Sequence, residues 1–248
     1  MTNGTPIHPF TRSTMKQLLI FSLLGFLTLP ACAQTWKQNR PISGVNALKA
    51  SAGVDVFVRQ GNTESLTLDV KGFDEDEVIA SVRNGQLTIS RERGNWFGGS
   101  PGMGTNRYIR AYLTVRQLSA IDVSSGADLK GETAFETEKL AIHVSSGADL
   151  ELTVKTRTLD VQVSSGADAN LTGSTGKLAA QVSGGANLNA DRLLADVCYA
   201  QASGGADARV YGGKELYLQA SGGADVNYRG PGRVMAKQES GGGDVNQN

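Results

Sequence analysis

The chain has 248 residues, and its 24 basic and 24 acidic side chains balance in formal charge. Without a basic run, the sequence does not favour nucleic acid or an anionic membrane surface as a partner. Its two cysteines are too few for the disulfide framework of small secreted domains.

The N-terminus has the pattern of an export signal. Met15 and the basic Lys16 are followed by a short apolar stretch, Leu18 to Leu29, and then by small residues up to Gln34. The stretch is shorter than the roughly 20 residues that span a bilayer. It therefore predicts a signal peptide over residues 1–33, with 1–14 as an upstream extension. We expect an exported protein of the periplasm, outer membrane or cell surface, with no membrane-spanning helix.

Two modes of cleavage stay open. Ala31-Cys32-Ala33 before Gln34 fits the small-x-small rule of ordinary signal peptidase. Leu29-Pro30-Ala31-Cys32 also resembles a lipobox, in which Cys32 becomes a lipidated N-terminus. A lipid would anchor the protein to a membrane without a spanning helix.

After a short linker, 34–42, residues 43–248 are interpreted as a single domain. Its first part repeats poorly, but alternating apolar residues predict strands around Val54–Val58, Leu66–Val70, Leu87–Ile89 and Ile109–Val115. Turns are expected at Gly61-Asn62 and Asn84-Gly85, and a short excursion in the acidic stretch Phe73 to Ala80.

A glycine-rich segment, 91–107, interrupts this part. It carries the apolar pair Trp96-Phe97. Two interpretations stay open: a binding loop, since long loops often carry function, or a cap or lateral loop that covers the first coil of a repeat. Trp96 and Phe97 are candidate binding residues under the first interpretation.

From residue 122 onward one phrase recurs, with a Ser-Gly-Ala-Asp type of turn. Its acidic or Asn positions are spaced by 18 to 21 residues, and a degenerate earlier copy is Ala50–Asp55. Tandem copies at a fixed period indicate stacked identical units. The positions are Asp128, Asp149, Asp168, Asn187, Asp207, Asp225 and Asp244.

Apolar residues alternate with polar ones on both sides of each turn. Leu140, Ile142 and Val144 show the alternation, which is typical of a strand with one buried face. A hairpin meander should alternate two different turns, whereas here every copy has the same turn. The sequence therefore predicts an all-β fold, a right-handed parallel β-helix with coils of about 20 residues.

The corner phrase suits such a coil. Glycine permits positive φ where the wall bends, and alanine fits the narrow inner edge. The serines fall one above another from Ser124 to Ser240, and we expect their hydroxyls to bond to the next coil.

These features resemble a known family. The opening Gly53–Val58 (Gly-Val-Asp-Val-x-Val), the Asn84-Gly85-x-Leu87-x-Ile89 strand and the stacked Ser-Gly-Ala-Asp turns are similar to the auto-transporter adhesin "head GIN" domain family. The resemblance covers about residues 43–246, and the family is common in Bacteroidetes. It implies a β-helical domain on the cell-envelope side with an adhesin role, and no catalytic residues to transfer.

The acidic column is the main candidate site. Its members on successive coils are Asp128, Asp149, Asp168, Asp207 and Asp225. Three interpretations stay open. The carboxylates accept local turn amides, bind a divalent cation such as calcium, or serve as acid and base in polysaccharide chemistry. The glycine-rich repeat of calcium β-rolls recurs about every nine residues, unlike this one.

The sequence offers few residues for other kinds of catalysis. His143 is the one histidine after the signal and occupies a slot filled elsewhere by Gln or Asp, and Cys198 is interpreted as a small core residue. No Ser–His–Asp triad, Cys–His pair or zinc cluster is expected within the chain.

The sequence thus favours a non-catalytic envelope or surface protein without a cofactor, which binds a surface polysaccharide or envelope protein through its β-helical face. A polysaccharide-active enzyme and a structural scaffold are the alternatives. Because an unpaired parallel edge invites another chain, association through the solenoid ends is also expected.

Overall fold

The computed structural model describes residue 1, residues 35–92 and residues 106–248. It is almost entirely β, and most of it is a solenoid of about 7 turns with ~19 residues per turn. The one helical element in these residues is a 3-10 turn, η1 (Glu75–Glu77). The strands in chain order are β1 (Thr35–Arg40), β2 (Ala47–Ser51), β3 (Asp55–Gln60), β4 (Ser65–Lys71), β5 (Val78–Arg83), β6 (Gln86–Arg91), β7 (Tyr108–Val115), β8 (Ala120–Ser124), β9 (Asp128–Ser145), β10 (Asp149–Ser164), β11 (Asp168–Ser183), β12 (Asn187–Ser203), β13 (Asp207–Tyr211), β14 (Glu215–Ser221), β15 (Asp225–Arg229), β16 (Arg233–Ser240) and β17 (Asp244–Gln247).

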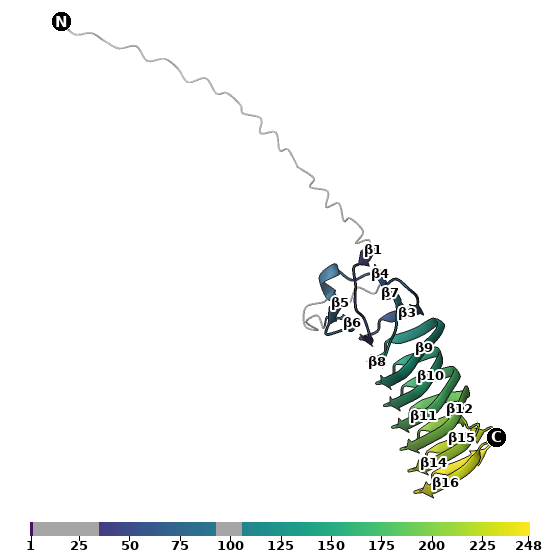
Figure 1. The fold of residues 1–248 in the computed structure, drawn as a ribbon. Helices are drawn as coiled ribbons and strands as arrows, with labels where there is room; N and C mark the ends of the chain where they lie inside the picture. Colours follow the sequence, from purple (N-terminus) through teal and green to yellow (C-terminus); the bar gives the residue numbers. More distant parts are fainter. Residues whose placement is uncertain (2–34, 93–105) are drawn as a thin grey trace. The chain divides into compact units, whose positions relative to one another are not determined.

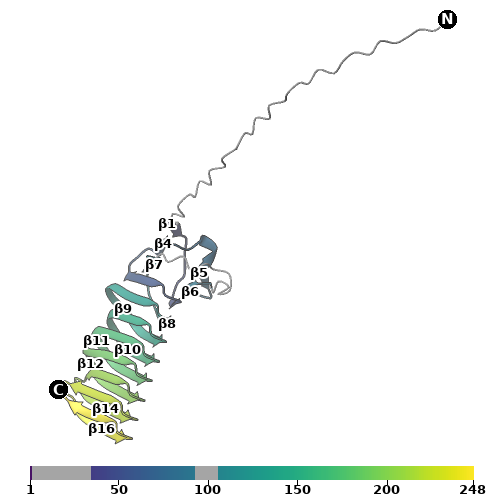
Figure 2. The ribbon, with the colours of Figure 1, turned by 180° about the vertical axis from the view of Figure 1, so that it is seen from behind.

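From β8 onward the chain winds in coils that pair in parallel with one another (Figure 1 and Figure 2). Asp128 lies opposite Asp149, and Asp149 opposite Asp168, so each coil advances the register by one whole repeat. The predicted parallel solenoid is confirmed. A hairpin meander would give antiparallel neighbours, and the described strands from β8 to β17 have none among themselves.

The interior of the solenoid is filled from alternate strand positions. Leu159, Val161 and Val163 of β10 are each at most 1% exposed, while the residues between them point outward. Burying a side chain of this size stabilises the fold by about 1.5–3 kcal/mol. Parallel stacking repeats the contribution in every coil, because the same position returns to the same wall.

Cys198 belongs to this interior. It lies in register with Leu178 and Leu216, and burial raises the pKa of its thiol to about 12. Cys198 is 0% exposed, so the prediction of a core residue is confirmed. A buried thiol with a raised pKa is also a poor nucleophile.

Each corner of the repeat is made by two consecutive residues in the left-handed region. Ser125 has φ 57° and Gly126 has φ 68°, and in later coils glycine holds both positions, as at Gly184 and Gly185. A left-handed conformation is strained for residues with a Cβ, which explains the glycine of the phrase. Ala52, with φ 65°, shows that the degenerate first copy makes the same corner.

The serine column lies in register, but its hydroxyls do not make the expected bonds. In the described chain no hydroxyl of the column from Ser124 to Ser240 is bonded to the next coil. The backbone makes these bonds instead: the Gly126 amide donates to the Ser146 carbonyl at 3.2 Å, and the Gly166 amide to the Gly184 carbonyl at 3.1 Å. The expectation was wrong because the corner amides point along the coil stack and pair directly.

The chain before β8 forms the first coil and a cover over it. β2 and β3 make that coil, with Ser51 opposite Ser124 and Asp55 opposite Asp128. β6 and β7 stack on their other side, again in parallel. β5, β4 and β1 then pair antiparallel with β6, β7 and β4. These antiparallel strands cover backbone groups of the outer coil that would otherwise be open to pairing.

Several predicted details of this part are confirmed. Strands occupy the expected positions in β3, β4, β6 and β7, and η1 lies in the acidic stretch. Asn84 and Gly85, with φ 50° and 78°, join β5 to β6 in a tight hairpin turn. Residues 35–40, within the stretch expected as a linker, form β1. Its Trp36 indole donates to the Phe73 carbonyl at 2.8 Å.

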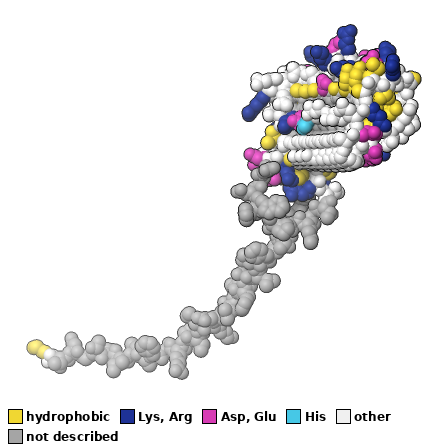
Figure 3. Space-filling view, turned by 90° about the horizontal axis from the view of Figure 1, so that it is seen from below, with side chains coloured by type: hydrophobic (Ala, Val, Ile, Leu, Met, Phe, Trp, Pro, Cys, Tyr) yellow, Lys and Arg dark blue, Asp and Glu magenta, His cyan; other side chains and the backbone are white. Residues whose placement is uncertain are grey.

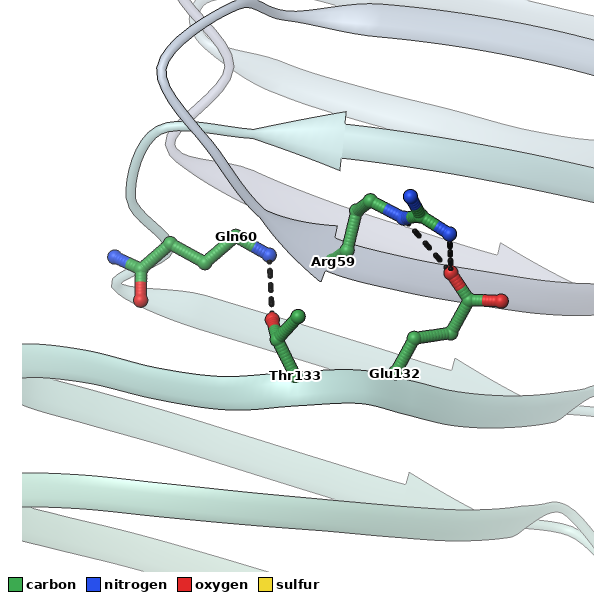
Figure 4. A network of polar contacts seen from close by, with 4 residues as sticks. All are labelled: Arg59, Gln60, Glu132 and Thr133. Carbon is green, nitrogen blue, oxygen red and sulfur yellow. Dashed lines mark hydrogen bonds and ion pairs between the residues drawn. The ribbon is translucent and has the colours of Figure 1, made fainter.

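Polar side chains clamp the first coil to the next one (Figure 4). The Arg59 guanidinium donates twice to one carboxylate oxygen of Glu132, at 2.9 and 2.6 Å. The backbone amide of Gln60 donates to the Thr133 hydroxyl at 2.9 Å. The clamp lies where β9 leaves β3, so it fixes the first regular coil on the irregular part.

The last described coil departs from the others. Met235 has no partner in β14, because a bulge separates the pairs Leu216–Val234 and Tyr217–Ala236. Glu239 stands where the other coils place valine or alanine, and its carboxylate accepts the Val245 amide at 2.7 Å. Glu239 is exposed, but it puts a charge at a register position that is apolar in the other coils. Bulges and charges at such positions are devices by which natural edge strands resist further pairing. They count against the expected association through this end.

Some predictions lie outside the described residues. The signal peptide over 1–33, the lipidation of Cys32 and the candidate residues Trp96 and Phe97 fall within 2–34 and 93–105. Among the residues that the structure describes, no helix is long and apolar enough to cross a membrane.

Candidate functional site

The five predicted aspartates come together in one straight column on the outer surface. Strand register places Asp128 opposite Asp149, Asp149 opposite Asp168, and Asp207 opposite Asp225. Asn187 of β12 takes the position between Asp168 and Asp207. The column is longer than predicted at both ends, since Asp55 of the first coil and Asp244 of the last coil continue it. Adjacent coils lie about 4.8 Å apart, so the carboxylates are near neighbours.

Two groups with N–H donors interrupt or end the column. The Asn187 side-chain amide donates to the Asp168 carboxylate at 2.7 Å. At the upper end Arg110 takes the register position above Asp55, with 3.7 Å between its Nε and the carboxylate. The arginine therefore offsets negative charge at the end of the column.

Electrostatics within the column are unfavourable to ionisation. The pKa of Asp128 is raised, first by partial burial and then by the charges of Asp149 and Asp55. Two like charges about 5 Å apart in water repel by only about 0.8 kcal/mol, so the column is tolerable where it is solvated. Within the described chain the carboxylates from Asp128 to Asp225 accept no turn amide, so that expectation was wrong. The corner amides are already used between coils.

Other outward columns pair opposite charges across coils. Lys130 lies 3.0 Å from Glu151, and Lys155 lies 3.5 Å from Glu136. Figure 3 shows dark-blue and magenta side chains lying next to one another at the margins of the stacked layers. The repeated aspartates are thus an exception to the charge pattern of this surface, which marks the column as a candidate.

A shallow hollow of about 460 Å³ lies over the upper part of the column. Besides Asp55, Asp128 and Asp149, it is lined by Phe57 and Lys130. It offers carboxylates, one cation and one aromatic ring to a ligand.

The described residues contain no group of three or more His, Cys, Asp or Glu side chains placed to hold a metal ion. Calcium takes six to eight oxygen ligands, whereas a straight column presents its carboxylates one per coil. His143 is exposed and lies in register with Asp122 and Gln162, the surface position that the sequence predicts.

A second surface feature, on the other side of the corner, was not predicted from the sequence. Tyr199 and Tyr217 lie on adjacent coils with ring centroids 4.4 Å apart and planes 6° apart. Beside them runs a ladder of glutamines in register: Gln162, Gln181, Gln201, Gln219 and Gln238. Their spacing of one repeat is visible in the sequence, but only a confirmed register shows that the rings touch.

The tyrosine pair lies in a hollow of about 240 Å³. Lys177 places its ammonium over the Tyr199 ring, 4.7 Å from the centroid. The Tyr217 hydroxyl donates to Glu215 at 3.1 Å, a bond that raises the pKa of the tyrosine. The pair is therefore held in place on one side by a cation and at one hydroxyl by a carboxylate.

Comparison with known proteins gives the class of protein. The family described as "Putative auto-transporter adhesin, head GIN domain" matches residues 45–232, and the chain belongs to this family. The resemblance found in the sequence is confirmed. None of the curated proteins matches the chain.

Solved structures share the fold at low sequence identity. A protein of Bacteroides fragilis described as a putative adhesin is 15% identical, with a TM-score of 0.76, over 87% of this chain and 97% of its own. A putative adhesin of Parabacteroides merdae is 16% identical, with a TM-score of 0.67, over 87% and 96%. A putative lipid binding protein of Parabacteroides distasonis is 13% identical, with a TM-score of 0.64, over 86% and 96%. These likenesses concern the fold alone.

Proposed function

We propose that the protein is a non-catalytic binding module of the cell envelope or cell surface, which holds a surface polysaccharide or envelope protein against the outer wall of its solenoid. Membership of an adhesin family supports the general role. The observation that carries the proposal is the repetition of outward chemistry: Asp128, Asp149 and Asp168 present the same group on successive coils. Such a surface suits a ligand that itself repeats.

Export is part of the proposal. The signal peptide over 1–33 would deliver the solenoid to the periplasm, outer membrane or cell surface. Mass spectrometry of the N-terminus after expression of the full chain tests this. A mass beginning at Gln34 supports ordinary cleavage, a lipid-modified Cys32 supports an anchor, and an uncleaved Met1 or Met15 would overturn export by this signal.

One observation favours a polysaccharide-active enzyme as the second candidate. A carboxyl with a raised pKa beside other carboxylates is the arrangement of a general acid and its partner, and Asp128 has that environment. However, the same column continues along the solenoid to Asp244, with Asn187 as its one non-acidic member from Asp55 onward. A catalytic site needs one distinctive coil, so the repetition supports binding.

Affinity electrophoresis distinguishes the two candidates. The protein is run through native gels that contain envelope or host polysaccharides, and the gels are then stained for cleared zones. Retardation without clearing is expected. Clearing that disappears in Asp128→Asn would replace the binding proposal with the enzyme. Free migration in all gels, together with no capture of envelope proteins, would leave the structural scaffold.

A further inference from the structure

We propose that the stacked pair Tyr199–Tyr217 is a binding subsite for one sugar ring at the end or on a branch of a neutral glycan. The inference rests on the proposed function and names a site for it that is separate from the aspartate column. The ring of the ligand would stack on the free face of Tyr217, above Ala236.

The geometry of the pair supplies the first argument. The two rings stack face to face across adjacent coils, so their outer faces point along the stack. Lys177 covers the face of Tyr199. Tyr217 is followed in register by Ala236, whose side chain is a single methyl group. The stack is thus open on one side only, and the open side has room for a third ring.

The strand beneath this position supplies the second argument. The bulge of β16 places Met235 next to Ala236 without a partner, and Met235 is 48% exposed. Bulges recur beside binding and active sites, where they redirect side chains. Here the bulge leaves an exposed apolar residue one position along the chain from Ala236, although the rest of β16 is mostly polar.

The polar groups at the edge of the hollow define the ligand class. Gln219 and Gln238 lie in register beside Tyr217 and Ala236, and both line the hollow. Each amide offers donors and an acceptor, as sugar hydroxyl groups require. A pyranose ring has one face of C–H groups that packs on an aromatic ring, and hydroxyl groups around its edge.

The neutral lining of the hollow disfavours two competing classes of ligand, nucleotides and acidic sugars. The side chains that line the hollow are neutral: tyrosine, alanine, leucine and glutamine. Lys177, whose ammonium lies over the Tyr199 ring, is on the face opposite to the open one. Among the residues that line the hollow, the phosphates of a nucleotide would find no basic partner, and neither would the carboxylate of an acidic sugar. A neutral sugar needs neither.

Substitutions on this face test the proposal. Tyr217→Ala removes the stacking surface, and Ala236→Leu fills the open position while leaving both tyrosines in place. Tyr217→Phe keeps the ring without its hydroxyl. Tyr112→Ala is the matched control, because Tyr112 is as exposed as Tyr199 and forms the other stacked pair, with Phe57, at 5.2 Å.

The probes are neutral polysaccharides, namely galactomannan, xyloglucan and laminarin, and two acidic ones, alginate and polygalacturonate, each in native gels with the full chain. At least one neutral glycan should retard the protein. Tyr217→Ala and Ala236→Leu should weaken that interaction by about tenfold or more, which corresponds to about 1.4 kcal/mol. Tyr217→Phe and Tyr112→Ala should retain it. Circular dichroism should show unchanged folding in every variant.

The other outcomes separate this inference from the proposed function. Retardation that survives both Tyr217→Ala and Ala236→Leu, or occurs with acidic polysaccharides alone, overturns the sugar subsite and leaves the binding module intact. Absence of retardation by any of the five polysaccharides overturns the subsite and removes polysaccharide as the partner of the module.

Discussion

From β9 to β17 each coil pairs with the next through the same corner, whereas from β1 to β7 the chain reaches the stack by antiparallel strands and side-chain clamps. In the regular half, hydrogen bonds between coils continue around the corner through the backbone. In the irregular half, Trp36 and Arg59 make specific side-chain bonds over long sequence separations. A repeat therefore needs little specific side-chain chemistry once its corner is fixed, so its outward positions are free for binding.

The largest expected effects come from the core, where the halves should respond differently. Leu159→Ala in the regular half and Leu68→Ala in the irregular half each remove a side chain that is 0% exposed. Each should lower the free energy of unfolding by about 2–5 kcal/mol. Hydrogen exchange should show loosening confined to neighbouring coils for Leu159→Ala, because solenoid coils contact only their neighbours. Uniform loosening of all coils by Leu159→Ala would contradict this picture.

Substitution of two glycines in the regular half by alanine compares the loss of stability at a crowded position with the loss at an open one. A Cβ on Gly173 would meet the Val154 carbonyl oxygen at 2.0 Å, whereas a Cβ on Gly147 meets nothing within 4 Å. Gly147→Ala should cost only the strain of a left-handed residue, about 1–2 kcal/mol. Gly173→Ala should lower the free energy of unfolding by clearly more than Gly147→Ala does, and urea denaturation of both variants measures the difference. Equal losses would show that backbone strain, not the contact between coils, decides both.

Ionisation of the column should depend on pH in a defined direction. The folded pKa of Asp128 is raised, so its ionisation destabilises the fold as the pH rises through that pKa. Asp128→Asn should therefore raise the melting temperature at about pH 7, and the difference should vanish below about pH 4, where the unfolded carboxyl is protonated too. Melting curves of both proteins across this range test it. A variant less stable at neutral pH would contradict the sign.

The clamp between the halves should contribute less to the free energy of unfolding. Arg59 and Glu132 are partly exposed, and such pairs contribute about 0.2–1 kcal/mol. Arg59→Ala should lower stability within that range, with less effect at high salt. Lys155→Ala, at an exposed pair inside the regular half, is the control. A loss above about 2 kcal/mol for Arg59→Ala would mean that the clamp nucleates the first coil.

Removal of divalent cations should have the smallest effect. A column without converging ligands gives calcium no tight site, so excess EDTA should leave the melting temperature unchanged within error. A fall that added calcium reverses would assign the aspartate column to cation binding.

The regular half was predictable from sequence because its physical requirement is local. Glycine holds the second of the two left-handed positions at every described corner, and the return of Gly126, Gly147 and Gly166 at one period reveals the coil. The strict alternation around Leu159 then identifies the buried wall. For the same reason the repeat spacing alone was enough to place the five aspartates in one column.

The irregular half, the tyrosine pair and the last coil were not predictable in this way, because they depend on contacts that do not recur at a fixed spacing in the sequence. β1 pairs with β4 about 30 residues later, so its register follows from tertiary packing. Among the described coils, this column holds two successive tyrosines only at Tyr199 and Tyr217, and a single spacing does not stand out from chance. Glu239 breaks the apolar pattern, but only the structure shows that its carboxylate accepts the Val245 amide.

Binding without cleavage can be measured by equilibrium depletion of the protein by insoluble envelope polysaccharide, with reducing ends assayed in the supernatant. We expect saturable loss of protein from solution and no rise in reducing ends above buffer. Reducing ends that increase with protein concentration and disappear in Asp128→Asn would contradict the non-catalytic role.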